Sequence, residues 1–275
     1  MSIADDQPKA NPGIGGLGVR ALYVAWRPSE PSMGWRPVGR LECVGPLYRF
    51  RYTKGAGKGG FRAFAGMQDL HATYTSAELF PIFANRLLSK SRPEYVEFLR
   101  WGAFEGDTPP DPLSILGVTE GLRQTDAIEV FPCPHPDANG CFSNKFFLHG
   151  IRWLPKASLD RIAKIDSGEA LKLMLDVQNH DDPKAVGLRT EIDRTLIGYF
   201  PRYLAHDVWQ LLHRCDVSFM HVTVDRVNAT APLQNRVLCQ LRACWPEGFR
   251  PCSTEDFQAN GERSSAGMGR LAPPP

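Results

Sequence analysis

The stretch LKLMLDVQNHDDPKAVGLRT, residues 171–190, decides how the second half of this chain folds. Apolar residues alternate with other residues from Leu171 to Val177, and this period of two predicts a strand with one buried face. The alternation stops at the polar segment 179–183 and resumes after it, which predicts a second strand at 185–190. The stretch therefore predicts a β-hairpin.

The two predicted strands are joined by the segment Asn179-His180-Asp181-Asp182-Pro183. Asn and Asp side chains bond to their own backbone and Pro fixes φ, so these residues are typical of a tight turn. Two adjacent carboxylates also suit a magnesium ion. A structural turn and a functional turn are both open at this point.

The rest of the second half alternates between helix and strand patterns. A short helix is predicted at 159–165, a strand at 195–200, a longer helix at 203–214, and two strands at 218–227 and 236–245. This number of short strands with one well-formed helix fits a small Greek-key barrel of the OB or SH3 kind.

The first half begins with strand patterns at 20–28, 35–45 and 47–55, whose short spacing predicts an antiparallel meander. Helix patterns follow at 76–91 and 92–104. A last strand pattern lies at 126–134.

The start of the first helix is predicted from two residues. Ser76 is the expected N-cap, and Pro81 should make the helix start near or kink at that proline.

We therefore predict an α+β chain, in which an N-terminal antiparallel meander with helices is followed by a small OB/SH3-like β-barrel with one main helix. The expected boundary lies in the Pro-rich loop 132–141. The predicted divisions are a disordered tail at 1–18, an α+β module at 19–140, a barrel domain at 141–250 and a disordered tail at 251–275.

The composition is that of an ordinary soluble globular protein. The chain has 275 residues, of which 43% are hydrophobic and 23% charged, and its net charge is +2. A nucleic-acid site would therefore have to be a local basic patch. The sequence shows neither a run of about 20 apolar residues nor a signal-peptide pattern. Seven cysteines, an odd number, indicate reduced thiols, so a cytoplasmic location is expected.

Two glycine-rich segments resemble phosphate-binding motifs. The segment GIGGLG at 13–18 matches G-x-G-x-x-G, but no strand precedes it and no helix follows it, so a dinucleotide site is not expected. The segment KGAGKGG at 54–60 lacks the Ser or Thr of a phosphate loop and is interpreted as a flexible hairpin tip that carries Lys54 and Lys58.

Catalytic and metal-binding patterns are weak. Cys133, His135, Cys141 and His149 are not spaced like the ligands of a structural zinc site, so no metal or other cofactor is expected. The sequence contains no G-x-S-x-G motif and no recognisable catalytic cysteine. The chain is therefore expected not to be an enzyme.

Several motifs of the second half resemble the HIRAN domain family, over about residues 145–247. The family runs as G-x-R-aromatic, a strand, an N-P-Y-D-x-N-A-like turn, and I-G-Y or V-G-H with a following helix. The matching residues, in this order, are Gly150, Arg152, Trp153, Asn179, Asp182, Ala185, Ile197, Gly198 and Tyr199.

The resemblance implies an OB-like barrel that captures the 3′ end of single-stranded DNA. An aromatic side chain would stack on a base, and Asp182 would accept a hydrogen bond from the terminal 3′-hydroxyl. A carboxylate repels phosphate, so such a site tolerates a strand that ends and rejects one that continues. The implied DNA-binding residues are Arg152, Trp153, Asn179, Asp182, Lys184, Tyr199 and Arg202, with Arg189 as a further cation.

One departure from the family pattern affects this expectation. His180 and Asp181 stand where the family's turn usually has Pro and Tyr, so a stacking ring is lost and a negative charge is added. DNA affinity should be weaker unless His180 or Tyr199 stacks instead.

The first half resembles the N-terminal subdomain of HipA-type toxin kinases. The matching residues, in order, are Val38, Gly39, Leu41, Phe50, Tyr52, Phe80, Phe83, Asn85 and Leu87. The catalytic part of those kinases is absent, so the resemblance implies a module that contacts a protein partner.

The preferred function is a non-enzymatic, bacterial-type protein that binds single-stranded DNA ends, by analogy in genome maintenance or DNA repair. The alternatives are a regulatory protein that binds only other proteins, and a metal-dependent hydrolase around Asp181 and Asp182.

Overall fold

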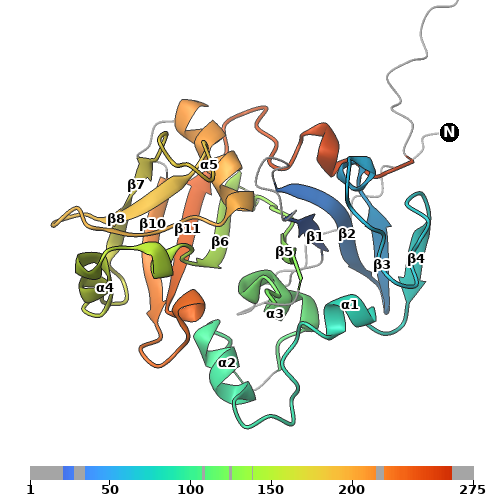
Figure 1. Cartoon of the computed structure of the whole chain (residues 1–275), viewed down its shortest axis with the longest axis horizontal. Helices are drawn as coiled ribbons and strands as arrows, with labels where there is room; N and C mark the ends of the chain where they lie inside the picture. Colours follow the sequence, from blue (N-terminus) through green and yellow to red (C-terminus); the bar gives the residue numbers. More distant parts are fainter. Residues whose placement is uncertain are drawn as a thin grey trace, which may run out of the picture.

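The computed structural model describes residues 21–27, 35–106, 109–123, 126–137, 139–214 and 220–261. Within these residues the chain forms two antiparallel sheets that lie next to each other (Figure 1). The segment GIGGLG, at 13–18, lies outside the described residues.

The first sheet has five strands in the order β4-β3-β2-β1-β5. The strands are β1 (Ala21–Trp26), β2 (Arg36–Val44), β3 (Leu47–Tyr52), β4 (Thr73–Ser76) and β5 (Ile128–Pro132). Successive strands β1, β2 and β3 pair antiparallel, as the predicted meander requires. Aromatic side chains such as Phe50, Tyr52 and Phe83 fill the core of this half and are fully buried.

Three helices accompany the first sheet: α1 (Pro81–Ala84), α2 (Tyr95–Trp101) and α3 (Pro112–Thr119). The prediction of Ser76 as an N-cap is wrong, because Ser76 ends strand β4 and α1 begins at Pro81. Proline suits this position since the first turn of a helix needs no donor from it.

Helix α3 was not predicted. Asp111 caps it, with Oδ1 accepting the backbone N–H groups of Leu113 and Ser114 at 3.0 Å each. Every residue from 113 to 118 is buried, so the helix has no polar face and shows no helical periodicity in the sequence.

The second sheet has six strands in the order β6-β11-β10-β7-β8-β9. The strands are β6 (Cys141–Phe147), β7 (Ala170–Leu175), β8 (Val186–Thr190), β9 (Leu196–Tyr199), β10 (Met220–Val227) and β11 (Val237–Cys244). Just after β6, His149 pairs with Tyr199 of β9 through two backbone hydrogen bonds of 3.0 Å. The two edges of the sheet thus meet, and the sheet curls into a barrel-like form.

Helices α4 (Lys156–Ile162) and α5 (Arg202–Arg214) and the short 3₁₀ turn η3 (Ile151–Trp153) belong to the second sheet. Helix α5 buries one face, including Leu204, Val208 and Leu211, in the core of this sheet. The rest of the helix is partly buried, and His213 and Arg214 at its end are exposed.

The two halves share a hydrophobic core. Tyr23, Ala25 and Phe131 of the first sheet belong to the same buried cluster as the interior of the second sheet. The rings of Phe131 and Tyr203 stack across this seam with centroids 4.3 Å apart and an interplanar angle of 7°. The first sheet therefore supports the second by direct packing.

The segment after residue 250 packs on the first sheet, whereas the sequence predicted a disordered tail from residue 251. It contains a 3₁₀ turn, η6 (Glu255–Phe257), and the backbone N–H of Asn260 donates to the carbonyl of Tyr52 at 2.9 Å. Residues 262–275 of the predicted tail lie outside the described residues.

The same contacts correct the interpretation of the segment 54–60 as a flexible tip. Gly55 is buried, and a Cβ there would lie 2.0 Å from the carbonyl oxygen of Pro37. Lys54 donates to Gln258 at 2.9 Å, and Lys58 forms an ion pair with Asp256. The glycine permits close backbone packing, and the lysines are held by the C-terminal segment.

Among the described residues, no helix has the length and apolar character needed to cross a membrane.

Candidate nucleic-acid interface

The segment between β7 and β8 is a turn held by its own side chains. Asn179 Oδ1 accepts the backbone N–H groups of Asp181 at 3.1 Å and Asp182 at 3.0 Å. Asp182 Oδ1 accepts the N–H of Lys184 at 2.9 Å. These contacts are the Asx-turn chemistry expected from the sequence, and they fix where the Asp182 carboxylate lies.

A further carboxylate, Asp176, links this turn to β9. Its Oδ2 accepts hydrogen bonds from Asn179 Nδ2 at 3.0 Å and from the Tyr199 hydroxyl at 2.9 Å. Burial, together with the neighbouring Asp176, raises the pKa of Tyr199. The phenol therefore stays protonated and serves as a fixed donor. Sequence reasoning missed Asp176, because it stands at the end of a strand pattern.

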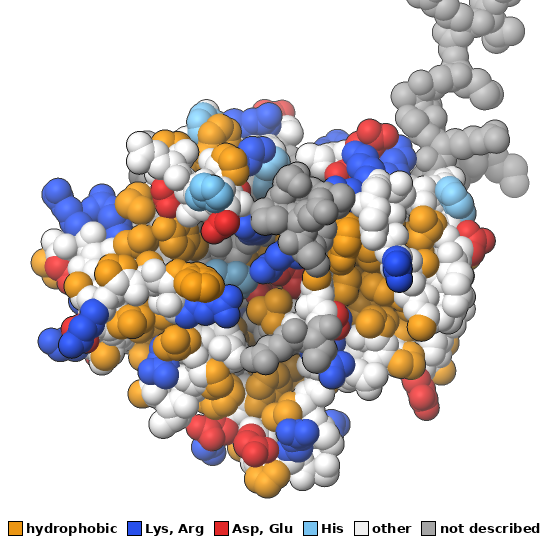
Figure 2. All heavy atoms as spheres, viewed as in Figure 1, with side chains coloured by type: hydrophobic (Ala, Val, Ile, Leu, Met, Phe, Trp, Pro, Cys, Tyr) orange, Lys and Arg blue, Asp and Glu red, His pale blue; other side chains and the backbone are white. Residues whose placement is uncertain are grey.

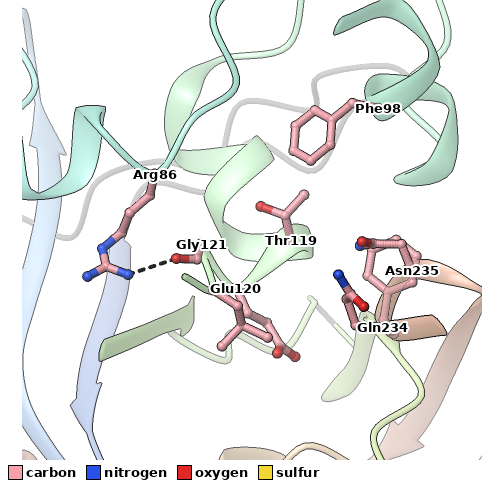
Figure 3. A pocket seen from close by; sticks show the side chains of 9 residues that line it. Arg86, Phe98, Thr119, Glu120, Gly121, Gln234 and Asn235 are labelled. Carbon is pink, nitrogen blue, oxygen red and sulfur yellow. Dashed lines mark hydrogen bonds between the residues drawn. The ribbon is translucent and has the colours of Figure 1, made fainter. Parts of the chain in front are cut away.

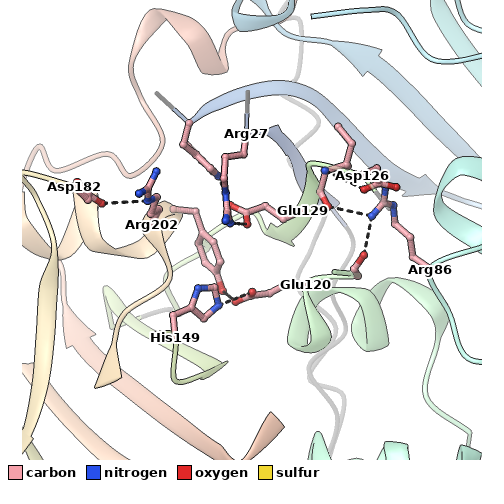
Figure 4. Close-up of polar contacts among 12 residues, drawn as sticks. Arg27, Arg86, Glu120, Asp126, Glu129, His149, Asp182 and Arg202 are labelled. Carbon is pink, nitrogen blue, oxygen red and sulfur yellow. Dashed lines mark hydrogen bonds and ion pairs between the residues drawn. The ribbon is translucent and has the colours of Figure 1, made fainter. Parts of the chain in front are cut away.

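Asp182 lies beside the guanidinium of Arg202. The Nε of Arg202 is 3.7 Å from Asp182 Oδ2, and its Nη2 donates to the carbonyl of Asp181 at 3.0 Å (Figure 4). The side chains of Asp182 and Arg202 are 23% and 32% exposed. Since 3.7 Å is longer than a hydrogen bond, Oδ2 of Asp182 keeps acceptor capacity toward solvent.

Trp153 stands out from the surface on the turn η3. Its side chain is 77% exposed, and the Arg152 guanidinium lies 4.6 Å from the centroid of the indole ring. Gly150 begins this turn with φ of +74°, and a Cβ on it would lie 3.0 Å from Tyr199 Cδ2. Glycine is needed there because the backbone packs against the Tyr199 ring.

The remaining predicted cations occupy two different places. Lys184 Nζ is 3.0 Å from His206 Nδ1 and lies 6.0 Å from the ring centroid of Trp209, so Lys184 extends from the turn toward α5. Arg189 lies farther along the hairpin, opposite Lys172, and is not part of the turn.

Most of the predicted residues are thus linked by contacts. The turn joins Asn179, Asp182, Lys184 and Arg202, and Asp176 connects the turn to Tyr199. Through Gly150, the Tyr199 ring adjoins the segment that carries Arg152 and Trp153. His180 and Asp181 point into solvent, with side-chain exposures of 102% and 77%.

The cysteines and histidines considered for zinc have separate partners. Cys141 Sγ is 2.8 Å from Cys244 Sγ, and His149 Nε2 is 2.7 Å from Glu120 Oε2. Burial raises the pKa of Cys133 to about 12, and His135 is exposed. Within the part of the chain that the structure describes, no three His, Cys, Asp or Glu side chains gather as metal ligands.

Buried polar residues lie at the seam between the two halves, close to this surface (Figure 4). Glu120 of the first half, whose side chain is 2% exposed, contacts His149 at 2.7 Å and accepts from the Tyr203 hydroxyl at 3.3 Å. Burial alone would lower the pKa of His149, but the Glu120 carboxylate outweighs it and the pKa is raised. Because His149 pairs with Tyr199, the first half helps to place the surface.

A cavity lies on another side of the seam (Figure 3). Its lining includes Arg86, Phe98, Thr119 and Gln234. Arg86 is held by the carbonyls of Gly121 and Ile128 and by Asp126, so its charge is already compensated. None of the lining residues belongs to the turn or to η3.

Comparison with protein families places residues 142–242 in the HIRAN domain family. A crystal structure of a protein from Lactobacillus plantarum is 15% identical, with a TM-score of 0.31, over 38% of this chain and 97% of that chain. The HIRAN domain of human HLTF is 14% identical, with a TM-score of 0.26, over 38% of this chain and 78% of that chain. No curated protein matches the chain.

The family match confirms the resemblance that the motifs of the second half indicated, with nearly the predicted bounds. The resemblance of the first half to HipA-type kinases is not supported by these comparisons and stays a prediction.

Proposed function

Because residues 142–242 form a HIRAN domain, we propose that this chain binds the 3′ ends of single-stranded DNA. The end-binding site consists of Arg152, Trp153, Asn179, Asp182, Tyr199 and Arg202. The observation that carries the proposal is the position of Asp182: the turn holds this carboxylate in place, with Oδ2 near Arg202 and open to a hydroxyl donor.

In this proposal Asp182 distinguishes a strand end from a strand interior. A terminal 3′-hydroxyl donates to Oδ2, whereas a 3′-phosphate brings a negative charge to a carboxylate. A hydrogen bond to a charged group contributes about 1.5–3 kcal/mol. Discrimination by this bond alone is therefore about 10-fold to 100-fold.

Trp153 supplies the base-stacking surface. The 77% exposed indole offers a flat apolar face to a base. Stacking on such platforms contributes about 1–3 kcal/mol per base. Arg152, which lies against the same ring, adds a positive charge for the adjacent phosphate.

The departure at the turn bears on affinity. His180 and Asp181 extend into solvent, and Tyr199 is anchored by its hydroxyl on Asp176 with its ring against Gly150. We therefore expect stacking to rest on Trp153 and the affinity to be modest. An OB- or SH3-like barrel remains part of the proposal, as do a cytoplasmic location and a role in DNA repair.

A second proposed role belongs to the first half, which would contact a protein partner as HipA-like modules do. Val44 and Leu47, paired across the β2–β3 turn, are 46% and 41% exposed and offer an apolar contact. A pull-down with the wild type and with Val44→Asp would test this role. A protein that the wild type retains should be lost in the variant.

The end-binding proposal is tested with two oligonucleotides of one sequence, which differ in a 3′-hydroxyl or a 3′-phosphate. Fluorescence anisotropy at low salt should show that the wild type binds the 3′-hydroxyl strand more tightly than the 3′-phosphate strand. In Asp182→Ala the difference between these two affinities should be smaller. Asp181→Ala is the matched control, since this neighbouring carboxylate is exposed. Equal binding of both strands by the wild type would refute the proposal.

The non-enzymatic proposal is tested separately. A nuclease assay with magnesium or manganese should show no cleavage by the wild type. Cleavage that disappears in Asp182→Ala would favour the hydrolase alternative.

A further inference from the structure

A row of aromatic and basic side chains follows the more exposed face of α5, where His206 and Trp209 are partly buried and His213 is exposed. His206, Trp209 and His213 are spaced three and four residues apart, so they lie on one face of the helix. Lys184 reaches the same face from the turn. We call these four residues the α5 stripe. Figure 2 shows histidine, basic and hydrophobic side chains side by side over α5.

The members of the stripe contact one another in order. Lys184 Nζ lies 3.0 Å from His206 Nδ1 and 6.0 Å from the Trp209 ring centroid. The rings of Trp209 and His213 have centroids 4.0 Å apart, with an interplanar angle of 32°. A continuous surface of cation and rings therefore runs from the turn to the last turn of the helix.

The stripe is continuous with the end-binding site. Helix α5 begins at Arg202, which contacts both Asp181 and Asp182, and the backbone N–H of Lys184 donates to Asp182 Oδ1. From Arg202 to His213 the helix rises about 16 Å. This length matches roughly five stacked nucleotides at about 3.4 Å each.

The charge of the stripe also suits a nucleic-acid strand. Asp207 belongs to the same helix but is 7% exposed and faces inward, where it accepts from the backbone N–H of Cys252 at 3.4 Å. Arg214 follows His213 and ends the helix with a further cation. Rings that stack on bases, set among cations that neutralise phosphates, form the usual path for a single strand.

One polar atom of the stripe has no partner. Among the described residues, nothing accepts a hydrogen bond from Trp209 Nε1, although this atom is buried. Because this atom is buried, a strand on the surface of the stripe does not reach it, and only the exposed part of the Trp209 ring is available to a base.

We propose that the α5 stripe binds the nucleotides that precede the 3′-terminal ones in a single-stranded DNA ligand. The direction of the strand rests on the end-binding function proposed above. Trp209 and His213 stack on bases, and Lys184 neutralises a backbone phosphate. Affinity then grows with strand length beyond the nucleotides that the end-binding site itself holds.

The test is a length series of 3′-hydroxyl oligothymidylates, bound to the full chain at low salt. The variant is Lys184→Gln combined with His213→Ala, because both side chains are exposed and their loss should leave the fold intact. The wild type should bind strands of about eight nucleotides at least fivefold more tightly than the variant, given the weakest stacking contribution of about 1 kcal/mol. Strands of two nucleotides should lose much less affinity in the variant, because they do not extend to His213.

The matched control is Lys172→Gln combined with His221→Ala. It removes the same residue types from exposed positions in β7 and β10, outside the stripe. This control should keep the length dependence of the wild type. Trp209→Leu, which keeps an apolar side chain against the core, should act like the stripe variant, and circular dichroism verifies its fold.

The outcomes separate this proposal from the proposed function. If the 3′-hydroxyl preference is present and the stripe variant has the same length dependence as the wild type, the stripe proposal is overturned. If the preference is absent at every length, end recognition fails. A fivefold loss for long strands in the variant would then still support the stripe as a single-strand path.

Discussion

The contact between Glu120 and His149 makes a quantitative prediction about the seam between the halves. Glu120→Gln keeps the size of the side chain but removes the charge that faces His149 at 2.7 Å. Breaking a buried ion pair usually costs about 3–5 kcal/mol. The His149 side chain is 26% exposed, which weakens the pair, so we expect a loss of roughly 2–3 kcal/mol in the free energy of unfolding.

The loss should depend on pH, because the pKa of His149 is raised in the folded chain. A raised histidine pKa contributes stability that is complete below the unfolded value of about 6.5 and disappears as pH rises through the folded value. The difference between wild type and Glu120→Gln should therefore be larger at pH 6 than at pH 9.

Urea denaturation at both pH values measures this difference. The control is Glu129→Gln, another buried carboxylate of the seam, which binds Arg27 at 3.0 Å and the Trp35 indole and acts on His149 more weakly. It should lower stability with a flatter pH dependence. An equal effect of Glu120→Gln at pH 6 and pH 9 would show that His149 does not titrate against Glu120.

Three further predictions concern the surface and its surroundings. Asp176→Ala should weaken DNA binding severalfold in anisotropy titrations, since the two hydrogen bonds by which Asp176 Oδ2 positions Asn179 and Tyr199 are both lost; unchanged affinity would refute the positioning role. Oxidised glutathione should convert Cys141 and Cys244 into a disulfide, which peptide mass spectrometry should detect in the wild type and not in Cys141→Ser. Burial and the neighbouring Lys184 lower the pKa of His206, and Asp182 opposes this more weakly. His206 should therefore gain its charge at a lower pH than an ordinary histidine, and this charge should strengthen DNA binding as the pH falls from 7 to 5. The increase in affinity should be smaller in His206→Gln.

The sequence predicted the elements whose side chains alternate between core and solvent. In strand β7 and helix α5, buried side chains recur among more exposed ones, and this produces a readable period. Strand β8 is almost wholly buried, and it was predicted from its place after the polar turn. Helix α3 was missed because it is buried on all sides, and β4 because four residues are too few to show a pattern.

The candidate site was predicted through motif order, which named Asp182, Trp153 and Tyr199. Asp176 was missed because its role depends on its contacts with Asn179 and Tyr199, and Tyr199 lies on a different strand. Trp209 and His213 were not predicted as site residues, although their helical spacing from Arg202 could have been recognised in the sequence. The role of Glu120 depends on the packing of the two halves, which no local pattern reveals.

End recognition is tested most directly by comparing a linear single strand with a covalently closed circle of the same sequence. Both ligands carry the same bases and nearly the same charge, but the circle has no 3′-hydroxyl to donate to Asp182. We expect the linear strand to bind at least about tenfold more tightly, the lower limit set by one charge-assisted hydrogen bond. Equal affinity for the circle and the linear strand would contradict the account.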